Sequence, residues 1–194
     1  MISKPRCFLD LLELQKILDD KVSKPRENGF TPRSREELDI LLSVDDEIQE
    51  WCRELPSELN FKTWKQKEYN REKELEELTD ILFFFLQYFN YHWMILERLG
   101  NEVDRNYYND KLVELATTFN KPLQVGCKFK TKLYSLKHCI WSDKMAEAFK
   151  VYLDIALTRG FNTNDLLETY WEKWQKNMTR INKDWVIQEW KSFY

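Results

Sequence analysis

Two pairs of acidic residues, each three positions apart, are the part of this sequence best suited to chemistry. The first pair is Glu47 and Glu50, and the second is Glu77 and Asp80. Each pair lies in a segment with helical periodicity, where residues three apart share a face with Cβ atoms roughly 5–6 Å apart. If the two helices pack antiparallel, four carboxylates meet at the edge of an apolar interior. Carboxylates there repel one another and lose hydration, so an oxygen-seeking cation would stabilise them.

The alternative for these pairs is an ordinary solvated helix face. The chain has 33 acidic residues, so pairs at this spacing also arise by chance. Five other acidic residues are assigned to solvated faces of this kind: Glu13, Glu36, Glu37, Glu72 and Glu74. The two pairs stand out because they occur together, with similar spacing and with a segment rich in Trp and Lys between them.

The ligand chemistry of the four carboxylates favours magnesium. All-carboxylate ligation suits Mg²⁺ or Mn²⁺ better than iron or zinc, and neither pair is followed by a His at ligand spacing. Because Mg²⁺ keeps positions for water and phosphate oxygens, a nucleotide phosphate chain is the expected substrate class. The pattern GxxxxGK[ST] is absent, so P-loop phosphoryl transfer is not expected. Hydrolysis by an activated water is favoured, because no nucleophilic side chain or second substrate is evident.

A second polar group lies near the C-terminus. Lys173, Asn177 and Arg180 recur at i, i+4 and i+7, so on a helix they form one stripe. Such a stripe is suited to a phosphate chain, because charge-assisted hydrogen bonds are among the strong ones. An exposed helix face without a ligand explains the spacing equally well.

The composition indicates one all-α domain, and we predict a single domain over residues 1–194. Only four Gly and five Pro favour helices over a sandwich or barrel. The formal net charge of −3 argues against a general nucleic-acid binder, and the apolar run at residues 81–86 is too short to span a membrane. Neither nucleic acid nor a membrane is therefore an expected partner. Four cysteines without metal-ligand spacing, and no signal peptide, indicate a cytoplasmic protein.

Apolar periodicity predicts a series of helices. Their expected ranges are 8–21, 35–55, 70–99, 108–119, 127–139, 142–159 and 166–180, with a short extension through Trp185 and Trp190. Residues 61–65 lie in a connecting segment that we expect to form a short helix. The aromatic residues of 70–99 cannot all face one way, so this helix is predicted to be central or part of a subunit interface.

Several helix ends can also be predicted. Ser34 begins a capping box for the helix at 35–55, and Leu38 is expected on the buried side of that helix. Gly100 and Gly160 are expected to end the helices that precede them. Asn162 or the next residue, Thr163, is expected to cap the last long helix.

Six motifs follow one another along most of the chain. In order, they are Leu14-Gln15-x-x-Leu18-Asp19-Asp20, Glu47-x-x-Glu50, Lys62-x-Trp64-Lys65, Glu77-x-x-Asp80-Ile81, Gly160-Phe161-Asn162 and Tyr170-x-x-Lys173-x-x-x-Asn177-x-x-Arg180. This order resembles the dimeric, all-α dUTPases, which belong with the dCTP pyrophosphatases and MazG-type enzymes in the all-α NTP pyrophosphatase superfamily. Many of these enzymes are encoded by bacteriophages. The resemblance is weakest over residues 100–140.

The resemblance implies a helical bundle of the all-α NTP pyrophosphatase type and a homodimer, in the host cytoplasm if the chain is phage-encoded. It implies four Mg²⁺ ligands, namely Glu47, Glu50, Glu77 and Asp80, with Mn²⁺ as a possible substitute. Glu47 or Glu50 would also help to activate the attacking water. Lys173, Asn177 and Arg180 would hold the phosphates, with Lys65 as a further contact.

The resemblance also implies a pocket for a pyrimidine nucleotide. Gln15 and Trp64 would shape the pocket for the base, and Phe84 would pack against the deoxyribose and disfavour a 2′-OH. Plain core packing is the alternative for these three residues. Asp19 stands where the dUTPases commonly have Asn, which bears on the identity of the base. After Arg180 the family usually continues Arg-Gln-x-x-Gly-Tyr, and this chain departs from that pattern.

The activity implied is Mg²⁺-dependent hydrolysis of dUTP to dUMP and pyrophosphate. A dCTP pyrophosphatase, or one that accepts both nucleotides, is the alternative within the same class. An alternative of another class is a non-catalytic helical interaction protein on the same fold. The four intact carboxylates favour an enzyme, since a binding role would not require all of them.

Overall fold

The computed structural model describes residues 2–26, 29–64, 66–100 and 102–182, without the side chain of Asn182. This part of the chain is all-helical. Its helices are α1 (Phe8–Val22), α2 (Glu37–Glu54), α3 (Arg71–Leu99), α4 (Glu102–Asn120), α5 (Phe129–Trp141), α6 (Met145–Thr158) and α7 (Thr163–Asn182). The expected all-α fold is confirmed. The predictions made for Lys65, Trp185 and Trp190 lie outside the described residues.

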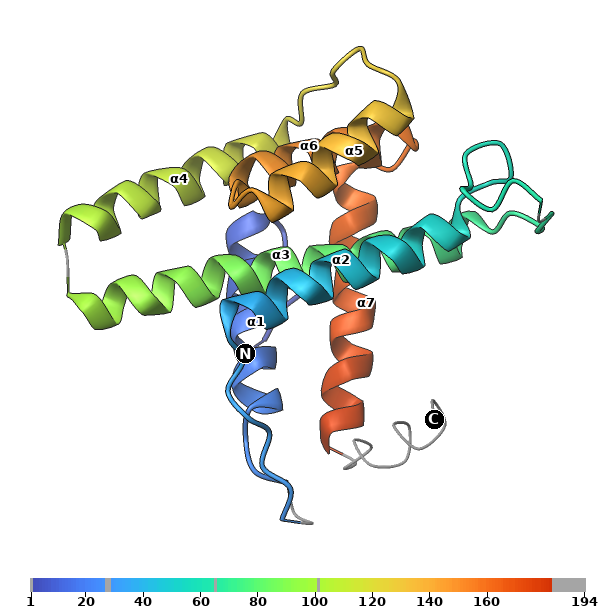
Figure 1. Cartoon of the computed structure of the whole chain (residues 1–194). Helices are drawn as coiled ribbons and strands as arrows, with labels where there is room; N and C mark the ends of the chain where they lie inside the picture. The colour runs from blue at the N-terminus through green and yellow to red at the C-terminus, as the bar shows by residue number, and fades with distance from the viewer. Residues whose placement is uncertain (1, 27–28, 65, 101, 183–194) are drawn as a thin grey trace.

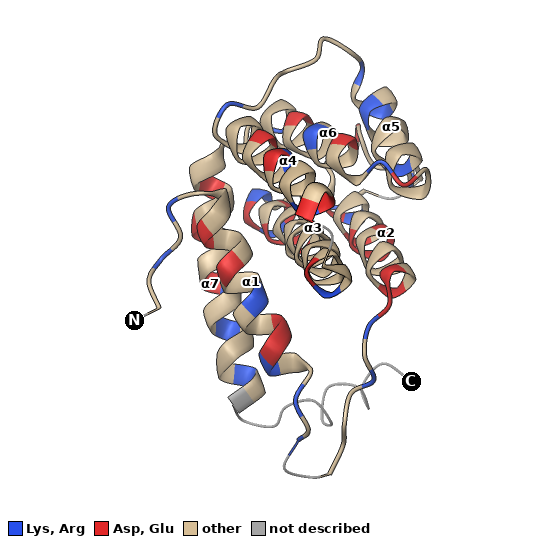
Figure 2. Ribbon diagram, turned by 90° about the vertical axis from the view of Figure 1, so that its left-hand side faces the viewer, with Lys and Arg blue, Asp and Glu red and all other residues tan. Residues whose placement is uncertain are grey.

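Helix α3 is the centre of the bundle, as its aromatic residues predicted. It packs against α1, α2, α4, α6 and α7, and Figure 2, which looks roughly along it, shows these helices around it. Phe83 stacks on Tyr170 of α7, while Phe85 meets Phe149 of α6. Aromatic side chains on several sides of α3 thus hold the surrounding helices together.

Helices α2 and α3 form an antiparallel pair. At one end of the pair Lys73 Nζ lies 3.2 Å from a carboxylate oxygen of Glu54. At the other end His92 Nε2 lies 3.2 Å from Glu37 Oε1. Helices α1 and α7 lie side by side and cross this pair steeply, and α4, α5 and α6 lie above the pair in the view of Figure 1. The indole N–H of Trp174 donates to the Leu14 carbonyl at 2.8 Å and fixes α7 against α1.

Most helix ends lie close to their predicted positions, and the glycine stops are confirmed. Gly100 and Gly160 have φ values of 69° and 79°, the left-handed conformation that glycine adopts without strain. Asn162 caps α7, because its Oδ1 accepts hydrogen bonds from the backbone N–H groups of Asn164 and Asp165 at 2.8 and 3.1 Å. Helix α4 is longer than predicted and begins at residue 102.

The predicted capping box of α2 was wrong, although the helix begins within two residues of its predicted start. Its N-cap is Glu36, which exchanges hydrogen bonds with Asp39 in a capping box, so Ser34 lies before the helix. Leu38 is 56% exposed, because the buried face turns toward Ile40 and Trp51. The segment between α2 and α3 forms turns and no helix in its described residues, which include 61–64. None of the described helices combines the length and the apolar composition needed to cross a bilayer.

The assignment of Glu74 to a solvated face was also wrong. Its carboxylate is fully buried and accepts hydrogen bonds from Arg159 at 2.7 and 2.9 Å, and from the hydroxyl of Tyr69 at 2.7 Å. Arg159 follows α6, so this ion pair ties the start of α3 to the end of α6. Sequence spacing could not show it, because the two charged residues are 85 positions apart.

Candidate active site

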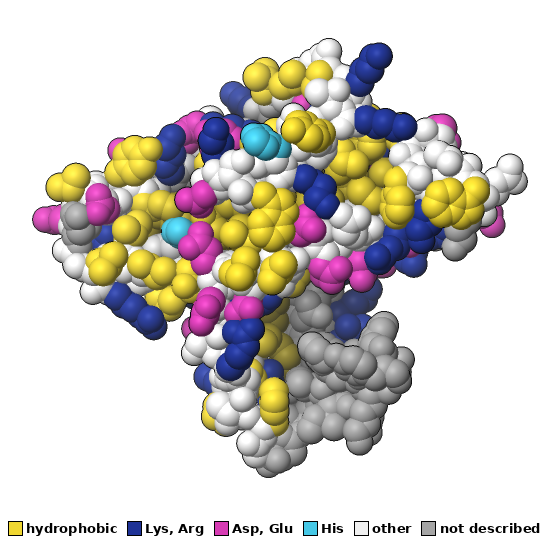
Figure 3. Space-filling view, in the orientation of Figure 1, with side chains coloured by type: hydrophobic (Ala, Val, Ile, Leu, Met, Phe, Trp, Pro, Cys, Tyr) yellow, Lys and Arg dark blue, Asp and Glu magenta, His cyan; other side chains and the backbone are white. Residues whose placement is uncertain are grey.

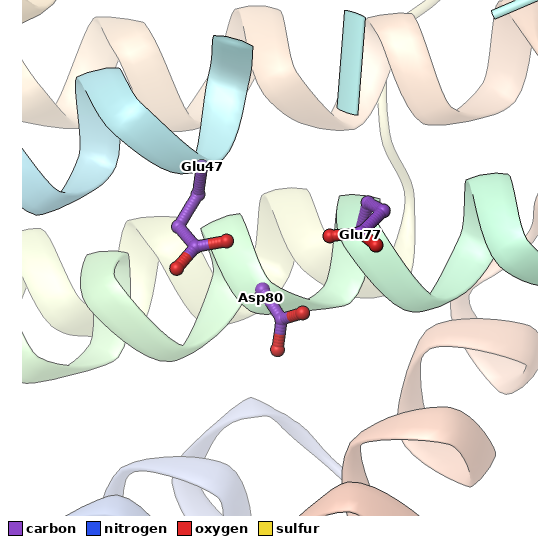
Figure 4. A group of neighbouring side chains, drawn as sticks. All are labelled: Glu47, Glu77 and Asp80. Atoms are coloured by element: carbon purple, nitrogen blue, oxygen red, sulfur yellow. The ribbon is translucent and has the colours of Figure 1, made fainter. Parts of the chain in front are cut away.

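Three carboxylates converge between α2 and α3. Glu47 comes from α2, while Glu77 and Asp80 come from α3, and each offers an oxygen within 4.8 Å of the others. Figure 4 shows Glu47 reaching across the gap between the helices toward the other two. All three side chains are partly buried. The antiparallel packing of two short acidic patterns therefore produces the cluster that the sequence predicted.

These three residues, which we call the acidic cluster, ionise less readily than free carboxyl groups do. Burial, followed by the charges of Asp80, Glu50 and Glu77, raises the pKa of Glu47 to about 8. Burial also raises the pKa of Glu77 and of Asp80, to which neighbouring carboxylates add. Partly buried carboxylates that repel one another are suited to bind a hard divalent cation such as Mg²⁺.

Glu50 lies at the solvent side of the cluster. Its side chain is 49% exposed and lies 3.9 Å from the guanidinium of Arg53. Its charge nevertheless raises the pKa values of Glu47, Glu77 and Asp80, so it lies within electrostatic reach of all three. The structure thus brings three of the four predicted carboxylates together and places the fourth at their rim.

Helix α7 contributes a cation to the same place. Lys173 Nζ forms an ion pair with Asp80 Oδ2 and donates to the backbone carbonyl of Glu76 at 3.2 Å. Asn177 and Arg180 lie one and two turns further along α7, the first half-buried and the second exposed. The predicted polar stripe of α7 therefore begins at the acidic cluster.

A network of side-chain hydrogen bonds lies about two turns of α3 beyond Asp80. Gln15 Nε2 and Gln87 Nε2 both donate to Oδ1 of Asp19, at 2.8 and 2.7 Å. The amide oxygen of Gln15 accepts a hydrogen bond from the hydroxyl of Tyr170 at 2.9 Å. The amide oxygen of Gln87 accepts one from Arg35 Nη1 at 2.7 Å. The network joins α1, α3, α7 and the segment before α2, and we name it the Asp19 network.

The sugar and base candidates differ in their surroundings. Phe84 is half-buried, with the guanidinium carbon of Arg35 5.2 Å from the centre of its ring. Gln15 is buried. Trp64, in the segment between α2 and α3, is by contrast 80% exposed. Lys65 lies outside the described residues.

Sequence reasoning missed Arg35 and Gln87. A signal for Gln87 was present, because it follows Asp80 by seven residues and Phe84 by three, which puts all of them on one face of α3. Arg35 gave no such signal, since it lies before α2 and meets Gln87 only through the fold.

The chain matches a sequence model of a protein family that is described as dUTPase. The match covers residues 8–185, a range that takes in the helices α1 to α7 and all the candidate site residues. A search of the curated proteins finds no match. With its all-helical fold and this match over most of its length, the chain belongs to the all-α dUTPase family.

Proposed function

We propose that the protein hydrolyses dUTP to dUMP and pyrophosphate at the acidic cluster, in a reaction that depends on Mg²⁺. Family membership gives the broader statement, a diphosphatase that acts on a nucleotide. The observation that carries the proposal is the convergence of Glu47, Glu77 and Asp80 within 4.8 Å in a chain of this family. Mn²⁺ is expected to replace Mg²⁺, because it has the same preference for oxygen ligands.

The metal would be held by Glu47, Glu77 and Asp80, with Glu50 joining from the rim. When bound, Mg²⁺ supplies positive charge for the phosphate oxygens and makes a neighbouring water easier to deprotonate. Glu47 or Glu50 would accept the proton of the attacking water. The position of Glu47 in the acidic cluster supports this role, because its carboxylate lies beside the place expected for the metal and its water.

The order of residues along α3 supports one orientation of the nucleotide. Asp80, Phe84 and Gln87 follow one another on one helix face, and seven residues of helix span about 10 Å. This length suits a nucleotide with its phosphates at the acidic cluster, its deoxyribose on Phe84 and its base at the Asp19 network. A ring packed against the sugar would leave little room for a 2′-OH.

Lys173, Asn177 and Arg180 would hold the triphosphate from the α7 side. Lys173 would exchange its ion pair with Asp80 for phosphate oxygens once a cation neutralises the cluster, because an ammonium is a mobile point charge with three donors. We include Lys65 as a further phosphate contact and Trp64 as a wall of the base pocket, both by family resemblance.

The second candidate within this function is a dCTP or mixed pyrimidine enzyme. The presence of Asp19 in place of Asn favours it, because an ionised carboxylate offers acceptors only. A non-catalytic interaction protein on the same fold stays as the alternative of another class. The clustered carboxylates argue against a non-catalytic protein, because burying charged groups is costly unless their charge has a function.

We also propose a homodimer with a cytoplasmic location, in the host cell if a bacteriophage encodes the chain. Family resemblance supports the dimer. Hydrophobic side chains gather on the face shown in Figure 3, on which α2 and α5 lie in front, and these helices have four hydrophobic side chains that are at least half exposed, Leu38, Leu42, Tyr134 and Trp141. Exposed apolar side chains in such number favour a protein contact.

A panel of dNTPs and NTPs with Mg²⁺, with products separated by chromatography, tests the proposal. We expect dUTP to give dUMP and pyrophosphate, no turnover with excess EDTA, and slower turnover of UTP. Asp80→Asn is the matched control for a contaminating activity. Turnover of dUTP that survives both EDTA and Asp80→Asn would rule out the acidic cluster as the site.

A further inference from the structure

Asp19 uses its two carboxylate oxygens unequally. Two amide groups, one from Gln15 and one from Gln87, donate to Oδ1 at 2.8 and 2.7 Å. A carboxylate oxygen accepts about two hydrogen bonds along its lone pairs, so these donors fill Oδ1. Oδ2 is therefore the oxygen with capacity for a further partner.

Arg35 decides which way the amide of Gln87 points. A guanidinium has only donors, so the atom of Gln87 that Arg35 contacts at 2.7 Å must be the carbonyl oxygen. The NH₂ group of Gln87 then faces Asp19 and can only donate. As a consequence, Oδ1 of Asp19 must act as an acceptor whether or not the carboxyl carries a proton, and any proton sits on Oδ2.

The orientation of the Gln15 amide is less strictly determined than that of Gln87. The hydroxyl of Tyr170 donates to the carbonyl oxygen of Gln15 at 2.9 Å, but a hydroxyl is able to accept as well. Gln15 alone would thus allow its amide to turn round. The polarity of the network depends on Arg35 and Gln87, which sequence reasoning did not single out.

We propose that Arg35 and Gln87 are positioning residues that orient Asp19, so that Oδ2 alone is presented to the pyrimidine base. This proposal rests on the proposed function for the nucleotide itself. An ionised Oδ2 accepts a hydrogen bond from the cytosine amino group or from uracil N3–H. A protonated Oδ2 donates to a uracil carbonyl or to the cytosine ring nitrogen. Each protonation state thus pairs with a different atom of each base, so the balance between the two bases is expected to change with the protonation of this one atom.

The charged groups around Asp19 set how readily it ionises. Burial raises its pKa to about 7, while the hydrogen bonds from Gln15 and Gln87 and the charge of Arg35 lower it, and the neighbouring Asp20 raises it. Tyr170 on α7 is the remaining titratable group in contact with the network. Removing the amide of Gln87 should therefore move the titration of Asp19 upward.

The test follows the Asp19 carboxyl carbon by NMR across pH in the full chain, without nucleotide, with Asp19→Asn to assign the signal. We expect Gln87→Met to raise the midpoint by at least half a pH unit. Arg35→Met should raise it too, because the positive charge is lost and Gln87 is free to turn. Arg35→Lys should restore much of the wild-type value, because lysine keeps the charge and also has only donors. Gln175→Met, an exposed glutamine on α7, is the control and should change nothing.

A second measurement compares the kcat/KM of dUTP with that of dCTP at each pH. Ionisations shared by both substrates, such as those of the acidic cluster, cancel in this ratio. We expect the ratio to change with pH around the midpoint of Asp19, and the change to move with that midpoint in Gln87→Met. An Asp19 titration that is the same in all variants, or a ratio that ignores pH, overturns the proposal. A chain that turns over neither nucleotide overturns the proposed function instead, and the titration, measured without nucleotide, still tests the orientation of Asp19.

Discussion

Lys173 and Asp80 form an ion pair that joins α7 to the acidic cluster on α3. The ammonium lies where a bound cation would interact with the same carboxylate, so the chain partly neutralises its own cluster. Lys173 also lowers the pKa values of Glu47, Glu77 and Asp80. In the proposed function, Lys173 and a cation from solution would thus compete for Asp80.

Lys173→Met should therefore bind Mn²⁺ more tightly when no nucleotide is present. Removing a unit charge this close to a divalent ion should strengthen binding roughly tenfold, given the size of such interactions near a protein surface. Titration calorimetry with Mn²⁺ alone measures it. Lys176→Met, an exposed residue on the same helix, should bind Mn²⁺ as the wild type does. Equal affinities in all three proteins would show that Lys173 and the metal do not compete.

Glu50→Gln and Asp80→Asn should each abolish most dUTP hydrolysis. Each change removes the charge of a proposed metal ligand and keeps the shape of the side chain. A loss of several kcal/mol in barrier height corresponds to a factor of a thousand or more, because about 1.4 kcal/mol is already tenfold. Single-turnover assays with Mg²⁺ give the rates, and assays with excess EDTA give the background. Rates near that of the wild type in both variants would remove the cluster from the mechanism.

Arg180→Ala should lower kcat/KM for dUTP by at least tenfold while leaving the melting temperature nearly unchanged. Charge-assisted contacts to phosphate matter most as negative charge shifts in the transition state. Arg180 is exposed, so its loss costs little folding energy. Activity and thermal unfolding are measured on the same preparation, beside Lys176→Ala. Unchanged activity, or a loss of activity that merely follows a loss of stability, would contradict a role in binding phosphate.

Asp19→Asn should make the stability of the protein depend less on pH. The pKa of Asp19 rises from 3.8 to about 7 on folding, so its folded form holds a proton that the unfolded chain has lost. The resulting stabilisation is complete below about pH 4 and is lost as the pH rises to about 7. Urea unfolding at pH 5 and pH 8, with EDTA, should show a smaller fall for Asp19→Asn than for the wild type, by on the order of 2 kcal/mol. Identical falls would mean that Asp19 is ionised at both pH values.

Asp19→Asn should also shift the substrate preference toward dUTP. In the orientation proposed for Asp19, the oxygen of the new amide would accept from Gln15 and Gln87, and its NH₂ group would take the place of Oδ2, where it can donate to a uracil carbonyl but cannot accept from the cytosine amino group. The wild type should hydrolyse dCTP measurably. A polar group of the base that is left without a hydrogen bond in the pocket costs roughly 1–3 kcal/mol, which lowers the rate but does not abolish it. The ratio of the kcat/KM values for the two nucleotides is the measurement. A wild type that excludes dCTP more than about a thousandfold, with no change in the variant, would show that Asp19 does not read the base.

Glu74→Gln should destabilise the fold strongly. The substitution leaves the guanidinium of Arg159 without its carboxylate, and breaking a buried pair by removing one partner costs about 3–5 kcal/mol. Chemical denaturation measures the free energy of unfolding. Glu72→Gln, an exposed acid two residues earlier on α3, is the control and should fall within about 0.5 kcal/mol of the wild type.

The sequence was informative wherever a feature depends on one helix or on the pairing of two. Apolar periodicity placed α1, α2 and α3 within about two residues of their ends. The acidic cluster was predictable because each of its two pairs is set by helical spacing, and only the antiparallel packing of α2 on α3 had to be assumed.

Features that depend on distant contacts were not predictable. Leu38 reads as a buried residue by its type, but the contacts of α2 with α3 turn it outward. Glu74 reads as a surface acid, and only the approach of Arg159 from the end of α6 explains its burial. The same holds for Arg35, whose role depends on meeting Gln87 across 52 positions.

The placement of Asp80, Phe84 and Gln87 on α3 makes the proposed site sensitive to changes in chain length. One residue inserted between Asp80 and Gln87 would rotate one end of the stripe by about 100° relative to the other. The acidic cluster and the Asp19 network would each survive on its own segment of helix, but they would no longer face the same nucleotide. Between these three residues, substitutions are therefore expected to be tolerated more readily than insertions or deletions.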